Sequence, residues 1–147
     1  MMSASIGRAV VLAFIVGVLA AGCGNDNTTT SPTTTSDVRN NETFSATLNV
    51  GQSQFYSFTA ISPGTTDITL VSIRPSGAVA STLSPVMGLG LGTPQATDCA
   101  LSSAVNTTPG LKSQLTVTTN VSVYCVKIAD IGNLTGAVDY TIRVVHP

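Results

Sequence analysis

The chain has 147 residues, and its six Lys and Arg side chains nearly balance seven Asp and Glu, for a formal net charge of −1 at pH 7. This balance argues against a nucleic-acid-binding protein, because a surface that neutralises phosphates needs clustered cations. The slight excess of acids also argues against electrostatic docking on anionic lipid.

Residues 1–22 have the pattern of an export signal. Arg8 is the one charged residue, and the apolar run "AVVLAFIVGVLAA" follows from Ala9 to Ala21. As a helix this run would extend about 20 Å, well short of the roughly 30 Å hydrocarbon core of a bilayer. A positive start, a short apolar centre and small residues at its end are typical of a cleaved signal and not of a membrane span.

Cys23 ends the stretch "LAAGC". This stretch resembles the lipobox of bacterial lipoproteins, which implies that Cys23 becomes the mature N-terminus and carries acyl chains. Several chains would make the attachment stable, whereas one chain binds only reversibly. Gly24 follows in place of Asp, so the resemblance implies the outer membrane or cell surface. The alternative is an ordinary secretory signal that leaves Cys23 as a free thiol.

Residues 23–37 are expected to form a flexible linker after the lipidated cysteine. The stretch "GNDNTTTSPTTTSD" has no aliphatic or aromatic side chain, so it has nothing to bury in a core. As a coil of 14 residues it would span about 20 Å, which holds a folded body just clear of the lipid headgroups.

Residues 38–147 are expected to form one domain of about 110 residues. Apolar and polar side chains alternate along several segments, as in half-buried strands. Turn signals rich in Gly, Pro and Asn separate these segments, and no helical period occurs after the signal. The alternating segments are 44–50, 53–60, 67–73, 87–91, 111–119, 123–131 and 138–144. The pattern predicts an all-β fold, a single antiparallel β-sandwich of seven or eight strands that is jelly-roll-like.

Cys99 and Cys125 are predicted to form a disulfide, as expected for an exported domain with two body cysteines. The alternation places Cys125 on the outward side of its strand beside Lys127. We therefore expect the bridge to fasten a loop to the sheet surface, outside the core. A zinc or redox pair is the alternative, but no further thiol or histidine lies nearby in the sequence.

Three segments resemble the pre-peptidase C-terminal (PPC) domains of secreted bacterial enzymes and their stand-alone relatives. They are "LNVGQSQFYSFTA", "DITLVSI" and "VYCVKIADIGNLTGAVDYTIRVV", which together extend over most of residues 42–146. The resemblance implies a β-sandwich without catalysis and a role in secretion, targeting or binding.

Catalytic and metal-binding patterns are absent from the sequence. The one histidine, His146, is next to the last residue and is expected to be exposed to solvent. The stretch "GLGLG" (Gly88–Gly92) lacks a following Lys and helix start, so we interpret its glycines as packing positions and not as a phosphate loop. The acids Asp67, Asp98, Asp130 and Asp139 are expected to be solvated, with convergence on calcium as the alternative.

The sequence thus predicts a membrane-anchored, non-catalytic lipoprotein without cofactor or metal, which binds or organises envelope or extracellular partners. The second hypothesis is an accessory carbohydrate- or matrix-binding module, with Phe55 as a candidate ligand contact. A hydrolase is the third. The membrane is the expected partner through the lipid anchor, together with an unidentified protein or glycan.

Overall fold

The computed structural model describes residues 38–79 and 81–147. The signal, Cys23 and the linker predicted for residues 1–37 lie outside the described residues. Eight strands form the domain: β1 (Asn40–Leu48), β2 (Ser53–Ala60), β3 (Gly64–Pro75), β4 (Met87–Gln95), β5 (Asp98–Thr107), β6 (Leu115–Thr119), β7 (Ser122–Asp130) and β8 (Val138–His146). No helix that could span a membrane occurs in the part of the chain that is described.

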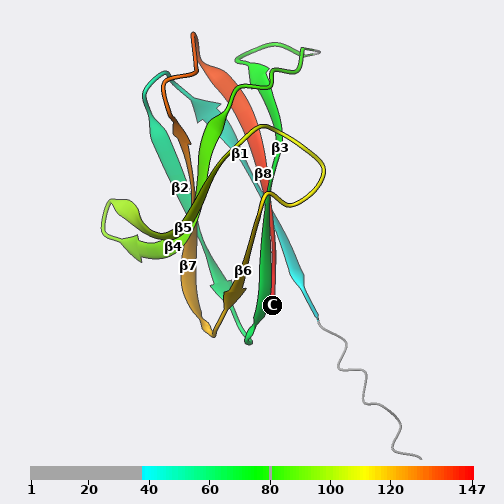
Figure 1. Ribbon diagram of the computed structural model, residues 1–147, viewed down its shortest axis with the longest axis vertical. Helices are drawn as coiled ribbons and strands as arrows, with labels where there is room; N and C mark the ends of the chain where they lie inside the picture. The colour runs from blue at the N-terminus through cyan, green and yellow to red at the C-terminus, as the bar shows by residue number, and fades with distance from the viewer. Residues whose placement is uncertain (1–37, 80) are drawn as a thin grey trace, which may run out of the picture. The chain divides into compact units, whose positions relative to one another are not determined.

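The strands form two antiparallel sheets of four (Figure 1). We call the sheet with order β1-β8-β3-β6 sheet A and the sheet with order β2-β7-β4-β5 sheet B. The predicted antiparallel β-sandwich is therefore confirmed.

The core lies between the two sheets and follows the alternation of the sequence. In β8 every second residue from Val138 to Val144 is buried, and in β7 Val126 and Ile128 are fully buried. Aromatic rings close one side of the sandwich, where Phe44 of β1 stacks on Tyr56 of β2 with ring centroids 4.7 Å apart. The alternation arises because successive side chains of a strand point to opposite faces.

Strand β3 contains an irregularity that explains its apolar pattern. The pairing with β8 shifts between Leu70 and Ser72, so Val71 is the extra residue of a bulge. Ile68, Leu70 and Ile73 are fully buried on either side of it. The bulge shifts the alternation of buried and exposed side chains by one residue, which is why the apolar residues Leu70 and Val71 are adjacent. Strand β3 is an inner strand of sheet A, between β8 and β6.

The two ends of the sandwich carry different connections. Asn40 pairs with His146 at the end where the described chain begins, which we call the proximal end, and Leu48 pairs with Val138 at the other, distal end. The connections at residues 49–52, 76–79 with 81–86, and 131–137 lie at the distal end. Those at residues 61–63 and 120–121 lie at the proximal end (Figure 1).

Candidate functional site

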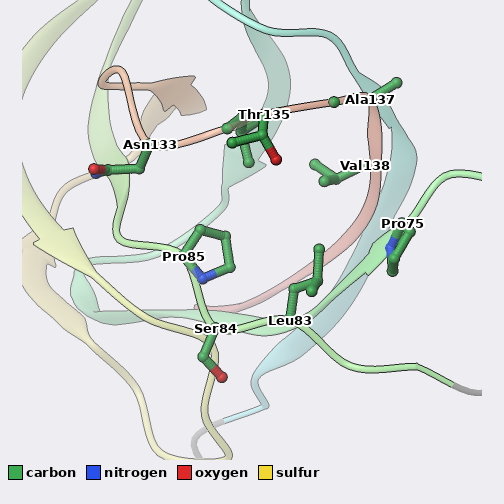
Figure 2. Close-up of a pocket in the computed structure, with 10 residues that line it drawn as sticks. Pro75, Leu83, Ser84, Pro85, Asn133, Thr135, Ala137 and Val138 are labelled. Atoms are coloured by element: carbon green, nitrogen blue, oxygen red, sulfur yellow. The ribbon is translucent and has the colours of Figure 1, made fainter.

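A groove lined mainly by apolar side chains lies at the distal end of the sandwich. It lies between the β3–β4 and β7–β8 connections and has a volume of about 370 Å³ (Figure 2). We call it the distal groove. Its lining consists of Pro75, Leu83, Ser84, Pro85 and residues 133–138. The side chains of Leu83, Pro85 and Val138 face one another across it.

Hydrogen bonds between the connections fix the walls of the distal groove. The Asn133 side-chain amide donates to the Val86 carbonyl at 2.9 Å, and so ties the β7–β8 connection to the β3–β4 connection. The Ser76 amide donates to the Ala137 carbonyl at 2.9 Å. The Leu83 amide donates to the Ile73 carbonyl at 2.8 Å and holds the far part of the β3–β4 connection against β3. These bonds hold the two connections together, and walls fixed in this way lower the entropic cost of binding.

Asp130, at the end of β7, organises the base of the same region. Its carboxylate accepts hydrogen bonds from four backbone amides: those of Gly51 at 2.8 Å, Gly132 at 2.9 Å, Asn133 at 2.9 Å and Leu134 at 3.2 Å. The bond from Gly51 lowers the pKa of this carboxyl most, and the amides of the β7–β8 connection lower it further. The charged carboxylate thus joins the β1–β2 turn to the wall of the groove.

The chemistry of the distal groove is that of a neutral, mainly apolar binding site. No lining residue has an ionisable side chain, so the groove offers neither a general base nor a nucleophile activated by one. Two prolines, two leucines and Val138 supply apolar surface, while the hydroxyls of Ser84 and Thr135 and several backbone groups supply polar contacts. This composition suits an uncharged ligand with an apolar part.

The predicted disulfide between Cys99 and Cys125 is present. It joins β5 to β7, and the two cysteines are only 3% and 0% exposed. The expectation that the bridge fastens a loop at the exposed surface is therefore wrong, because it is buried and joins two strands. The expectation that it lies outside the core is confirmed, because neither cysteine belongs to the core cluster that contains Val126 and Ile128. The β4–β5 hairpin folds over β7, as the 2.7 Å ion pair between Asp98 and Lys127 shows, and covers the bridge.

Phe55 is half-buried on β2, opposite Lys127 of β7. It lines a shallow depression with Ser53, Gln54, Tyr56, Thr97 and Asp98. The tip of the β4–β5 hairpin therefore forms one wall of the depression that Phe55 lines.

His146 is buried, so the expected exposure of this residue is wrong. It is 1% exposed, because β8 extends through it and pairs with Asn40 of β1. Its Nε2 lies 2.9 Å from a carboxylate oxygen of Glu42, and its ring lies 4.8 Å from that of Phe58. This histidine packs between the sheets and is not accessible to a substrate.

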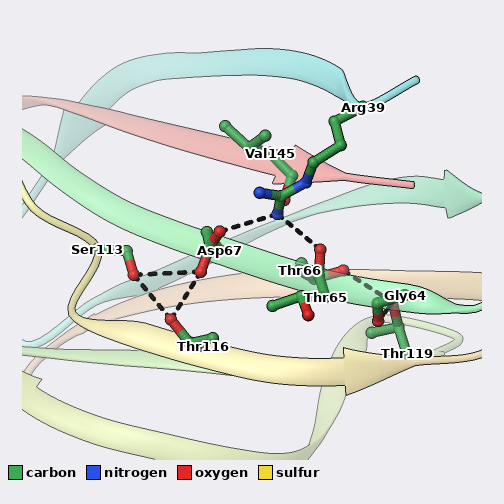
Figure 3. A network of polar contacts seen from close by, with 9 residues as sticks. All are labelled: Arg39, Gly64, Thr65, Thr66, Asp67, Ser113, Thr116, Thr119 and Val145. Carbon is green, nitrogen blue, oxygen red and sulfur yellow. Dashed lines mark hydrogen bonds and ion pairs between the residues drawn. The ribbon is translucent and has the colours of Figure 1, made fainter. Parts of the chain in front are cut away.

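The four acids do not converge. Asp67 accepts hydrogen bonds from Thr116 at 2.7 Å and from Arg39 at 2.8 Å, and these bonds, Thr116 first, lower the pKa of its carboxyl (Figure 3). Asp139 accepts from Thr47 at 2.6 Å and from the Gly77 amide at 3.2 Å. Within residues 38–79 and 81–147, no three His, Cys, Asp or Glu side chains are grouped so that they could hold a metal ion.

The "GLGLG" segment packs as predicted. Met87, Leu89 and Leu91 are buried in the core. On the other face, a Cβ at Gly90 would come within 2.8 Å of the Leu101 side chain, and one at Gly92 would overlap the carbonyl oxygen of Ala100. The glycines are needed because β5 approaches this face of β4 closely.

No protein-family model matches the chain, and no curated protein matches it. The resemblance to PPC domains therefore stays a prediction. The sequence did not reveal the distal groove, although the "DIGN" stretch (Asp130–Asn133) carries a turn signal that marks one of its walls.

Proposed function

We propose that this protein is a lipid-anchored, non-catalytic bacterial envelope lipoprotein, and that it binds an envelope or extracellular partner through the distal groove. The lipobox-like stretch before Cys23 and the Thr-rich linker support the anchor. The resemblance to PPC domains supports a binding role. The observation that carries the proposal is the position of the groove, at the opposite end of the sandwich from the start of the described chain.

This position presents the groove away from a membrane that holds the N-terminus. Strand β1 has nine residues and so extends about 30 Å from the proximal to the distal end. The linker expected from the sequence would add about 20 Å as a coil. When the proximal end faces the membrane, the distal connections are accordingly the part of the domain that lies furthest from the bilayer.

The surroundings of the ionisable groups support a binding role without catalysis. Arg39, Lys127 and His146 each contact an acid within the described part of the chain, and none of them lines the groove. Binding there would rest on apolar burial and on hydrogen bonds to backbone groups and hydroxyls. The expected partner surface is accordingly neutral, with an aliphatic or prolyl side chain that enters the groove.

Site-specific photo-crosslinking in native membranes tests the proposal. A photoreactive amino acid at Thr135, which is exposed in the groove, is compared with one at Thr118, which is exposed on the outer face of sheet A. We expect a discrete adduct from position 135 and none from position 118. Equal labelling at both positions, or none at either, would contradict a binding role for the groove, and turnover of any substrate by the purified protein would contradict a non-catalytic role.

An accessory carbohydrate- or matrix-binding module is the second candidate, because Phe55 lines its own depression beside the β4–β5 hairpin. Aromatic side chains present an apolar face on which a sugar can stack. If the protein is retained on glycan or collagen arrays and Phe55→Ala is not, this result would favour carbohydrate or matrix binding at Phe55 over binding of a partner through the distal groove. A hydrolase is the third candidate, and the burial of His146 against Glu42 and Phe58 counts against it.

A further inference from the structure

The proximal end of the sandwich exposes a group of aliphatic side chains. Val38 is 72% exposed, Ile61 65%, Val121 62% and Val123 47%. We call these four residues the aliphatic base. The distal end also exposes aliphatic side chains, among them Val50 and Val79, but only those of the proximal end lie beside the residues at which the described chain begins. Exposed aliphatic side chains in this position are suited to contact with an apolar phase.

The pairing of the strands brings these residues to the same end. Ala60 of β2 pairs with Ser122 of β7, so Ile61 and Val121 are the next residues beyond the last pair of these two strands. The Ile61 amide donates to the Pro147 carbonyl at 3.1 Å, which places it beside the end of β8. Val38 precedes the pair formed by Asn40 and His146. Figure 1 shows the β2–β3 and β6–β7 connections at the same end as the start of β1 and the C-terminus.

The chemistry of this end suits the interface of a bilayer. Residues 61–63 and 120–123 contain no ionisable side chain, and their polar members are Ser and Asn. The nearby Arg39 guanidinium donates to the Asp67 carboxylate at 2.8 Å and to the Thr65 and Val145 carbonyls, so it does not add an unpaired charge. Aliphatic tips would enter the acyl boundary while Ser and Asn stay among the headgroups.

We propose that the aliphatic base is a lipid-docking surface that rests on the bilayer holding the anchor. This inference depends on the lipid anchor of the proposed function. The linker would keep the base at high effective concentration near the membrane, so a few side chains suffice for a contact that a free protein would not make. Docking at this end sets the sandwich upright and directs the distal groove away from the bilayer.

Tryptophan fluorescence tests the docking surface, because the chain contains no tryptophan and one substitution gives a unique signal. Ile61→Trp and Val121→Trp report on the base. Val79→Trp is the matched control, since Val79 is 92% exposed in the β3–β4 connection of the distal end. The native, full-length protein carrying each substitution is reconstituted in vesicles of phosphatidylethanolamine and phosphatidylglycerol, with and without brominated acyl chains.

We expect blue-shifted emission and quenching from positions 61 and 121, at a depth of roughly 5–10 Å below the headgroup boundary. Position 79 should emit as in water and resist quenching. Vesicle-bound protein with unquenched indoles at both base positions would overturn the docking surface alone, as would equal quenching at position 79. Protein that does not sediment with the vesicles would instead contradict the anchor, and with it the docking surface.

Discussion

The Asp130 carboxylate accepts a hydrogen bond of 2.8 Å from the Gly51 amide, 79 positions earlier in the chain. Through this contact one charged group holds the β1–β2 turn against the β7–β8 connection, and so braces the distal groove. Gly51 has a positive φ of 72°, a conformation that glycine adopts at little cost and that turns its amide toward Asp130.

Replacing Asp130 by Asn is expected to lower stability at neutral pH, because the neutral amide is a weaker acceptor for four backbone amides. The pKa of this carboxyl is lowered in the folded protein, so its contribution is present above about pH 4 and is lost as the pH falls through the folded pKa. Urea unfolding from pH 7 to pH 2 should show the two proteins converging in acid. A constant difference at every pH would contradict the role of the charge.

The Gln114 side chain continues the pairing of sheet A beyond β6. Its Oε1 accepts from the Leu70 amide at 2.7 Å, and its Nε2 donates to the Leu70 carbonyl at 3.3 Å. Gln114→Ala should cost about 1–3 kcal/mol by leaving the Leu70 amide unpaired, whereas the Leu70 carbonyl keeps its hydrogen bond from the Gly110 amide at 2.9 Å. Hydrogen exchange at the Leu70 amide should accelerate, whereas Gln114→Glu should keep that amide protected. Unchanged exchange in Gln114→Ala would contradict this pairing.

Gly92→Ala is expected to destabilise the protein by about 1–3 kcal/mol or more, because the added methyl group would overlap the Ala100 carbonyl. Gly136→Ala is the control, since a Cβ there meets nothing within 4 Å. It should change stability by no more than about 0.5 kcal/mol. Equal effects of the two substitutions in thermal unfolding would show that β5 does not approach β4 as described.

Removal of the disulfide by the double substitution Cys99→Ala and Cys125→Ala should cost about 3.5 kcal/mol, from the entropy of a loop closed over 26 positions. Reduction of the wild-type protein should lower its free energy of unfolding in denaturant by a similar amount, and the reductant should not affect the double variant. A reductant effect on the variant would point to a cause other than this bridge.

The sequence predicted the sandwich because its period of two is strong. Along β8, from Val138 to Val144, and at Val126 and Ile128 of β7 the pattern names the buried residues correctly. Cys125 of β7 is also buried, although the pattern places it on the outward side. The sequence does not predict strand β5, because the apolar residues of "DCALSSAVNT" stand next to one another and do not alternate with polar ones. The strand lies at an edge of sheet B, where burial does not impose alternation.

The features that the sequence predicts wrongly or not at all have a common cause, because they depend on contacts between segments that are distant in the chain. His146 was expected to be exposed because it is near the end of the chain, yet β1 and Phe58 cover it. The distal groove depends on bonds such as that between Asn133 and Val86, and no local pattern predicts them. The anchor is the opposite case, because a local stretch around Cys23 carries the whole prediction.

The intact mass of the native protein from the membrane fraction tests the central claim most directly. We predict a chain that begins at Cys23 and carries the added mass of a diacylglyceryl group and an amide-linked acyl chain, together with loss of both from a Cys23→Ser variant that no longer sediments with membranes. Native protein that is soluble, unacylated and cut elsewhere would contradict the anchor on which the proposed function depends.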